Sequence, residues 1–338
     1  MSEKIKILII TDTTSRQTNG VVRTMRSTID LLLKDYDVRV ISPEDFKTIE
    51  LPSYREIDIA INTDNIVNLI EDADPEHIHI STEGPVGLAG KRYCDRVGYR
   101  YTTSYHSMFP EFIRDMFKIP TWLTYPYFKW FHAKSAAVFV PTDSVKHLLQ
   151  SKGFKNLVVW RRGVDRNQFN SLHRDRTDDS RLKMVTCVSR VSKEKGLDDF
   201  CGLELPENYL KVLVGDGPYL ETLMERYPDV AFTGKKSGIE LAAKYANADV
   251  FVFPSKTDTF GLTQLEAMAS GTPVIAYRGT ASDEIIDEGI TGLLVDEITI
   301  DIIDKAITMN RETVEKSSRR WSWESCTKTF AGNLVKSK

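Results

Sequence analysis

Two carboxylates, Asp258 and Glu266, have seven residues between them in the stretch of the chain most suited to chemistry. Asp258 lies in a polar loop, and Glu266 lies on the helix expected to follow it. That helix begins at Phe260, Gly261 and Leu262, where free N–H groups could hold a diphosphate and the glycine lets a ligand approach closely. Nearby carboxylates suit a sugar or a ribose, whose hydroxyl groups donate hydrogen bonds. Either acid alone could be an ordinary helix or turn residue, but the constellation favours a binding site.

Two cations lie in a second loop of the same half of the chain. Arg190 and Lys195 are five positions apart in the strand-to-helix segment 189–196, so their charges could converge on one diphosphate. The alternative is a solvated basic surface. Lys235 follows a further short strand at 230–234.

The elements around these residues predict a parallel sheet. The apolar run Phe251–Phe253 is a strand bounded by Pro254, a helix is expected over 261–269, and the next strand starts at Val274. Gly271 suits the left-handed end of the helix. Ligands of such sheets bind where loops leave the carboxyl ends of the strands.

The first half of the chain repeats the strand–helix alternation. Apolar runs at 5–10, 36–41, 77–80, 101–105 and 137–140 predict its strands. Gly20 follows the first strand and precedes a helix that should run through Leu33, so its backbone could approach a ligand. His106 comes where a strand ends and a ligand cleft should begin. A chain of 338 residues with this pattern predicts an α/β protein of two doubly wound, Rossmann-like domains facing a cleft.

These motifs resemble the family 4 retaining glycosyltransferases of the GT-B fold. That family's signature is two acids separated by seven residues, with Asp258 here in place of the usual glutamate. The sequence TDTFGL at 257–262 and the EGPVG loop at 83–87 are similar to the branch of GDP-mannose-dependent α-mannosyltransferases and sulfoquinovosyl and other glycolipid glycosyltransferases. Residues 189–196 resemble its Gly-Arg-Leu…Glu-Lys-Gly motif, and residues 104–106 its donor-side histidine.

The resemblance assigns roles residue by residue. It implies that the first acid binds sugar hydroxyls, that the second acid binds the nucleotide ribose, and that the two cations stabilise the leaving diphosphate. The expected catalytic residues are Arg190, Lys195, Asp258 and His106, and the expected donor-binding residues are Gly20, Lys235, Phe260, Gly261, Leu262 and Glu266. We expect no metal site, because the Asp72–Asp74 pair precedes a strand instead of following one.

The resemblance also implies the domain roles. Residues 1–166 with a returning helix at 320–338 are expected to form the acceptor side, and residues 167–319 the domain that binds the donor. The polar run 170–181 is interpreted as the linker between them, or its exit.

Composition narrows the partners and the compartment. A net charge of −3 gives no basic footprint for nucleic acid. The four cysteines are scattered and are interpreted as reduced thiols, which favours the cytoplasm. The aromatic and basic stretch 109–131 has two interpretations: a helical pair packed under the cleft, which we favour, or a peripheral membrane contact.

The predicted activity is metal-independent, retaining transfer of a hexose from a nucleotide-diphosphate sugar to a glycan or lipid-linked acceptor. GDP-mannose is the favoured donor and UDP-glucose the alternative, with no cofactor required. A nucleotide-sugar epimerase and a non-catalytic nucleotide-sugar binder are the alternative functions. The sequence leaves the oligomeric state open.

Overall fold

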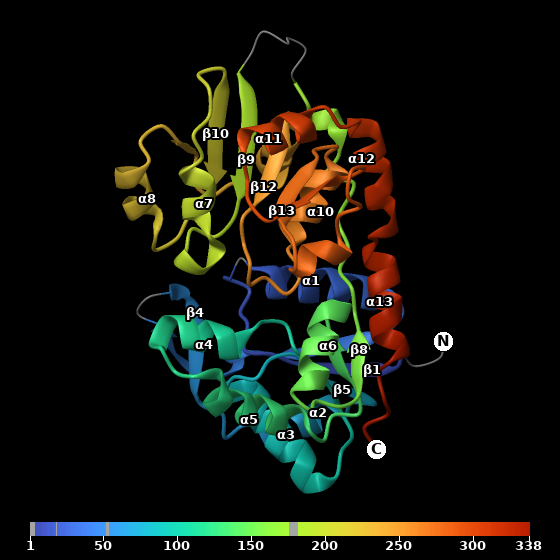
Figure 1. The fold of residues 1–338 in the computed structure, drawn as a ribbon. Helices are drawn as coiled ribbons and strands as arrows, with labels where there is room; N and C mark the ends of the chain where they lie inside the picture. Colours follow the sequence, from blue (N-terminus) through green and yellow to red (C-terminus); the bar gives the residue numbers. More distant parts are fainter. Residues whose placement is uncertain (1–3, 18, 52–53, 176–181) are drawn as a thin grey trace. The chain divides into compact units, whose positions relative to one another are not determined.

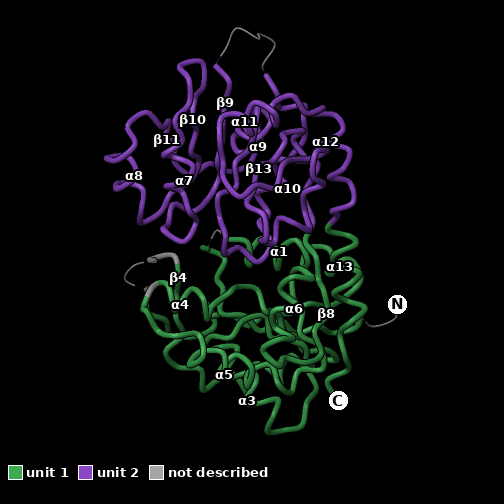
Figure 2. The backbone as a smooth tube through the Cα atoms, viewed as in Figure 1, with its two compact units in different colours: residues 1–162, 323–338 green, residues 163–322 purple. Residues whose placement is uncertain are grey.

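The computed structural model describes residues 4–17, 19–51, 54–175 and 182–338. Residues 176–181 of the predicted linker lie outside them. The chain divides into two compact units, one formed by residues 1–162 with 323–338 and the other by residues 163–322 (Figure 2).

Unit 1 is built on a parallel sheet with the strand order β2-β1-β5-β6-β7-β8. The strand β1 reads KILII and is buried along almost its whole length, as expected of a parallel strand covered on both faces. The strands are β1 (Lys6–Ile10), β2 (Asp37–Ile41), β5 (His77–Ile80), β6 (Thr102–Ser104), β7 (Val138–Val140) and β8 (Leu157–Val159). An antiparallel hairpin, β3 (Lys47–Leu51) and β4 (Tyr54–Asn62), forms a separate small sheet.

Helices cover both faces of this sheet because successive side chains of a strand point to opposite sides. Leu8 and Ile10 pack with side chains of α2 and α3, whereas Ile7 and Ile9 pack with those of α1 and α13. The helices are α1 (Gly20–Leu32), α2 (Ile66–Ala73), α3 (Pro85–Val97), α4 (Phe109–Phe117), α5 (Thr121–His132), α6 (Asp143–Ser151) and α13 (Trp323–Gly332).

The last helix, α13, returns to unit 1, where it packs against α1 (Figure 1). Phe330 is fully buried against the rings of Phe139 and Trp160. The indole N–H of Trp160 also donates to the carbonyl of Cys326 at 3.1 Å. The C-terminal residues are therefore part of the first unit's core.

Unit 2 repeats the design with the parallel strand order β11-β10-β9-β12-β13-β14. Along β12, Phe251 and Phe253 face a core containing α9 and α10, and Val250 and Val252 face a core containing α7 and α11. The strands are β9 (Lys183–Val188), β10 (Tyr209–Val214), β11 (Ala231–Phe232), β12 (Val250–Phe253), β13 (Val274–Tyr277) and β14 (Gly292–Val295). The helices are α7 (Leu197–Cys201), α8 (Leu220–Arg226), α9 (Gly238–Asn247), α10 (Leu262–Ala269), α11 (Ile300–Ile307) and α12 (Arg311–Ser317).

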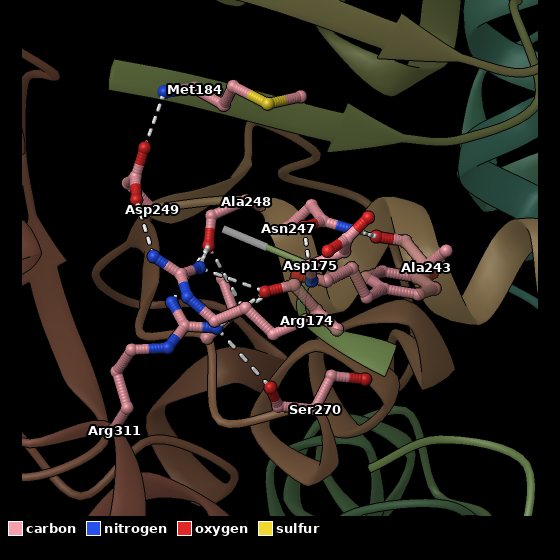
Figure 3. Close-up of polar contacts among 12 residues, drawn as sticks. Arg174, Asp175, Met184, Ala243, Asn247, Ala248, Asp249, Ser270 and Arg311 are labelled. Atoms are coloured by element: carbon pink, nitrogen blue, oxygen red, sulfur yellow. Dashed lines mark hydrogen bonds and ion pairs between the residues drawn. The ribbon is translucent and has the colours of Figure 1, made fainter. Parts of the chain in front are cut away.

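Two arginines join distant segments at the amino edge of this second sheet (Figure 3). Arg174 and Arg311 both donate to the carbonyls of Ala246 and Ala248 at the end of α9, at 2.8–3.1 Å. Arg174 also pairs at 3.0 Å with Asp249, whose other oxygen accepts the backbone N–H of Met184. Cations at a helix C-terminus satisfy its open carbonyls, so this cluster is a structural clamp at the edge opposite the candidate site.

Candidate active site

The predicted phosphate loops of unit 2 follow β9 and β12, which are neighbours in the sheet. Gly196 ends the turn that carries Lys195, at a φ of 64°. A side chain there would meet the carbonyl of Pro254 at 2.7 Å, so only glycine allows the two loops to pack this closely. The adjacent strands therefore bring residues far apart in sequence to one place.

Lys195 and Asp258 form an ion pair between these loops. The ammonium lies 2.6 Å from Oδ1 of Asp258, and the two side chains are 19% and 24% exposed. Burial opposes ionisation of Asp258, but the charge of Lys195 and, more weakly, of Arg190 lowers its pKa below the ordinary value. Two of the predicted catalytic residues are thus in direct contact as opposite charges.

Arg190 faces a carboxylate that the sequence analysis did not single out. Its Nη2 lies 3.4 Å from Oε1 of Glu194, which also accepts a hydrogen bond from the hydroxyl of Ser192 at 2.6 Å. Glu194 lies between the two cations in the sequence, and this position is the one feature from which its role could have been predicted. Each predicted phosphate-binding cation is therefore matched by an acid.

Glu266 lies in the second turn of α10 and is only 4% exposed. The hydroxyl of Tyr245, from α9, donates to its Oε2 at 2.7 Å. A buried carboxylate held by a neutral phenol keeps the capacity to accept further hydrogen bonds, as a ribose-binding acid requires. Glu266 is therefore not an acid on the solvent-exposed face of the helix.

The N-terminus of α10 is shaped by Gly261, which precedes the helix at a φ of 88°. A Cβ there would meet the ring of Phe253 at 2.7 Å, so the position requires glycine. The helix begins at Leu262, one residue later than expected. The side chain of Phe260 is in the core, edge-to-face with Trp321, so only its backbone is open to a ligand role. Lys235 is exposed after β11, at the edge of the same sheet.

His106 belongs to unit 1, at the carboxyl end of β6, and is 7% exposed. Its Nδ1 lies 3.3 Å from a guanidinium nitrogen of Arg162, and its Nε2 lies 3.1 Å from the hydroxyl of Ser81. A guanidinium can only donate, so Nδ1 accepts and the ring proton is on Nε2. Burial, and then the charge of Arg162, hold the pKa of His106 well below its usual range, which keeps the imidazole neutral.

Arg162 is itself buried, although it carries a charge. It lies over the ring of Trp160 at 4.4 Å from the centroid and donates to the carbonyl of the same residue. Burial lowers its pKa to about 10, so it remains a cation at neutral pH. Arg162 has no role among the residues predicted from the sequence.

The EGPVG loop of unit 1 is organised by a second residue without a predicted role. Asp12 accepts hydrogen bonds from the hydroxyl of Thr82 and from the backbone N–H groups of Gly84, Val86 and Gly87 at 2.7–3.2 Å. A side chain on Gly84 would strike this carboxylate at 2.5 Å. Asp12 therefore requires glycine at position 84, whereas a Cβ at Gly87 would first meet the carbonyl of Thr82, at 1.9 Å.

Glu83, in the same loop, contacts the histidine that directly follows the aromatic stretch. Its Oε1 lies 3.2 Å from Nε2 of His132, whose Nδ1 is 2.8 Å from the hydroxyl of Thr103. The hydroxyl of Tyr127 donates to the backbone carbonyl of Glu83. These contacts fix Glu83 and are invisible in the sequence, because they depend on how α5 packs.

The predicted residues therefore form two groups. Arg190, Lys195 and Asp258 meet in unit 2 beside the start of α10, while His106 belongs to unit 1. Gly20, also in unit 1, is the exposed first residue of α1, whose N-cap Asn19 accepts from two backbone N–H groups. Within the described ranges, no three His, Cys, Asp or Glu side chains are grouped to hold a metal ion. Asp74 pairs instead with Lys338 and Lys6.

Family models match both halves of the chain. Residues 18–168 match the model described as Glycosyltransferase Family 4, and residues 183–310 match Glycosyl transferases group 1. The chain belongs to the family 4 glycosyltransferases. It is accordingly a hexosyltransferase that uses a nucleotide-sugar donor.

Individual relatives of this glycosyltransferase agree with that placement. It is 26% identical to a GDP-mannose-dependent alpha-mannosyltransferase of Corynebacterium glutamicum, with 87% of this chain and 77% of that protein covered. It is 30% identical to the sulfoquinovosyl transferase SQD2 of Arabidopsis thaliana over 86% of this chain, which spans 62% of that protein's length.

A solved structure supports the fold of this glycosyltransferase. Anabaena Alr3699/HepE in complex with UDP and glucose superposes with a TM-score of 0.72 at 16% identity, over 97% of this chain and 98% of that one. The predicted GT-B fold, with two Rossmann-like domains, is confirmed. Among the described residues no helix is long and apolar enough to cross a membrane.

Proposed function

We propose that this glycosyltransferase moves mannose from GDP-mannose to a lipid-linked or glycan acceptor, with retention of configuration and without a divalent metal. Unit 2 binds the donor and unit 1 the acceptor. The observation that carries the proposal is the convergence of Arg190, Lys195 and Asp258 beside the N-terminus of α10. The choice of mannose rests on the activity of the GDP-mannose-dependent relative from Corynebacterium glutamicum.

The chemistry follows from where charge develops. Departure of the nucleoside diphosphate leaves negative charge on the phosphate oxygens, and Arg190 and Lys195 stabilise it as preorganised cations. The first N–H groups of α10 add the positive end of a helix dipole. Asp258 accepts hydroxyl hydrogen bonds from the transferred sugar, which passes through an oxocarbenium-like state. Glu266 accepts from the ribose.

His106, in unit 1, serves the donor sugar as a neutral imidazole. Its proton lies on Nε2, which faces the hydroxyl of Ser81. A neutral imidazole adds no positive charge that would repel an oxocarbenium-like sugar. This assignment is independent of the diphosphate-binding roles in unit 2.

The test is turnover of the purified full chain with GDP-mannose, GDP-glucose and UDP-glucose, each with and without a diacylglycerol or glycolipid acceptor. We expect GDP release and a mannosylated product only when acceptor is present, unchanged by a chelator, with an α-anomer seen by NMR. Arg190→Met and Lys195→Met should each lower turnover about a hundredfold. Release restored only by added magnesium, or an inverted product, would refute the mechanism.

Transfer of glucose from UDP-glucose is the second candidate, because the Anabaena structure that this fold resembles holds UDP and glucose. The same panel separates the two donors by which nucleoside diphosphate appears. It also separates the other functions: an epimerase would change the sugar without an acceptor, and a non-catalytic binder would bind the nucleotide sugar and release nothing.

A further inference from the structure

The end of α4, the start of α5 and the residues between them expose four large apolar side chains within seven consecutive residues. Phe117 and Trp122 are 62% and 71% exposed, and Ile119 and Leu123 are 40% and 53% exposed. We name these four residues the aromatic turn. Lys118 and Pro120, which lie between them, are also exposed.

The two helices already have a core, and the aromatic turn is not part of it. Tyr125 and Phe128 of α5 pack under the sheet with Val138 and Leu149. Trp122 and Trp130 are eight positions apart and lie on the opposite, exposed face of α5, with the exposed Pro126 one turn from each. A packed helical pair and a membrane contact are therefore not exclusive alternatives, because α5 combines a packed face with an exposed apolar face.

A cluster of four exposed, large apolar side chains indicates a surface that binds a partner. Soluble monomers scatter single apolar residues over their surfaces but rarely cluster several large ones. Trp122 is the most exposed of the five tryptophans, whereas Trp160 and Trp321 are buried. Tryptophan has an apolar body and a polar N–H, a combination that suits an interface between water and lipid.

The charges around the aromatic turn indicate the chemistry of the partner that it binds. Residues 109–134 hold four Lys or Arg and two Asp or Glu, in a chain whose net charge is −3, and one of the four, Lys134, lies 3.7 Å from Asp95. One of these acids, Asp115, pairs with Arg114 at 2.7 Å, and the other, Glu111, accepts from the hydroxyl of Tyr125. Lys118 and Lys129 are exposed beside the apolar residues. The surface is therefore apolar at its centre and positive at its edge.

We propose that the aromatic turn docks this protein on an anionic membrane surface. Trp122, Leu123 and Phe117 enter the headgroup region, and Lys118 and Lys129 lie against lipid phosphates. The proposal deepens the proposed function by naming the surface that would bring the enzyme to a lipid-linked acceptor, and only that kinetic consequence rests on the proposed function. Binding to vesicles does not require an active enzyme.

The test is flotation of the full chain with vesicles of phosphatidylcholine alone and with vesicles of equal parts phosphatidylcholine and phosphatidylglycerol. We expect flotation with the anionic vesicles, weakened by salt because exposed charges are screened. The double variant W122S/L123S should lower the partition constant about tenfold or more, since both apolar side chains leave the bilayer. Lys118→Gln should weaken binding only to the anionic vesicles.

The matched control is Ile239→Ser, which removes an apolar side chain that is 73% exposed on unit 2. It should float like the unchanged protein. In the unchanged protein, brominated lipids should quench tryptophan fluorescence, a readout that needs no variant and so stands even if W122S/L123S unfolds. Transfer to a water-soluble acceptor should be unchanged in W122S/L123S, whereas transfer to a vesicle-borne acceptor should fall.

Three outcomes would overturn the proposal. The unchanged protein could fail to float with anionic vesicles, or Ile239→Ser could lose binding as fully as W122S/L123S. Alternatively, sedimentation could show self-association that W122S/L123S abolishes, with no lipid quenching, in which case a second copy of the chain covers the aromatic turn. Loss of transfer to both kinds of acceptor with flotation intact would count against the proposed function and leave the docking surface standing.

Discussion

Replacing Asp258 by Asn should change the affinities for the two donor-side ligands in opposite directions. Lys195 is held 2.6 Å from the Asp258 carboxylate, so a diphosphate arriving at Lys195 competes with that acid and is repelled by it. Asn has the same shape without the charge. The variant should therefore bind the bare nucleoside diphosphate more tightly and the intact nucleotide sugar more weakly.

The magnitudes follow from exposure and charge. Both partners are about a fifth to a quarter exposed, and pairs that water reaches contribute about 0.2–1 kcal/mol. Releasing Lys195 should therefore lower the GDP dissociation constant by up to about fivefold. A hydroxyl bonded to a carboxylate contributes about 1.5–3 kcal/mol, so GDP-mannose should lose about twofold to a hundredfold in affinity even after this gain.

Calorimetric titration of GDP and of GDP-mannose into the unchanged protein and the Asp258→Asn variant measures these opposite changes in affinity. Glu194→Gln is the matched control, because it neutralises the acid facing Arg190 and should also tighten GDP binding, without the loss for GDP-mannose. A double-mutant cycle with Lys195→Met should remove the gain for GDP. If Asp258→Asn weakens GDP as much as GDP-mannose, the pairing argument and the sugar-binding role are both wrong.

Three further predictions concern other residues. Glu266→Gln should weaken GDP and GDP-mannose alike, by about tenfold in calorimetry, since the ribose is common to both; unchanged GDP binding would exclude the ribose role. Arg162→Met should add an acid limb to the pH profile of kcat/KM, because removing a cation raises the pKa of His106 and the ring gains a proton as pH falls. The unchanged protein should lack that limb, and identical profiles would show that Arg162 does not keep the ring neutral. Arg311→Met should lower the free energy of unfolding by about 2–3 kcal/mol in urea melts while leaving kcat unchanged, since it caps α9 away from the site; a selective loss of kcat would contradict a purely structural role.

The sequence was sufficient to predict features that depend only on residues close together in the chain. Buried parallel strands read as apolar runs, so the elements around Asp258 are placed within one or two residues; β6, expected over 101–105, is shorter at Thr102–Ser104. Gly261 was expected at the start of α10 because glycine lets a ligand approach the backbone, and the structure adds that its backbone is left-handed there. The family resemblance predicted features that the hydrophobic pattern cannot show, including the return of the last helix to the first unit.

The sequence was insufficient where a contact depends on sheet order. Lys195 and Asp258 are 63 residues apart, and they meet only because β9 and β12 are adjacent. Asp12 organises the EGPVG loop for the same reason, through the pairing of β1 with β5. The contact of Glu83 with His132 depends on the packing of α5, and aromatic residues conceal that histidine in the sequence.

The pairing of opposite charges in unit 2 bears on which ligands the site accepts. An inorganic phosphate that binds Lys195 must displace Asp258. That carboxylate then loses its ion pair, and the phosphate gives it no new contact that would offset the loss. A nucleotide sugar supplies the diphosphate to Lys195 and Arg190 and, at the same time, hydroxyl donors to Asp258. The paired ground state therefore disfavours simple anions and favours a ligand that carries an anion and hydroxyls at a fixed separation. A nucleoside diphosphate lacks the sugar hydroxyls, which is why its affinity, and not that of the nucleotide sugar, should rise when Asp258 loses its charge.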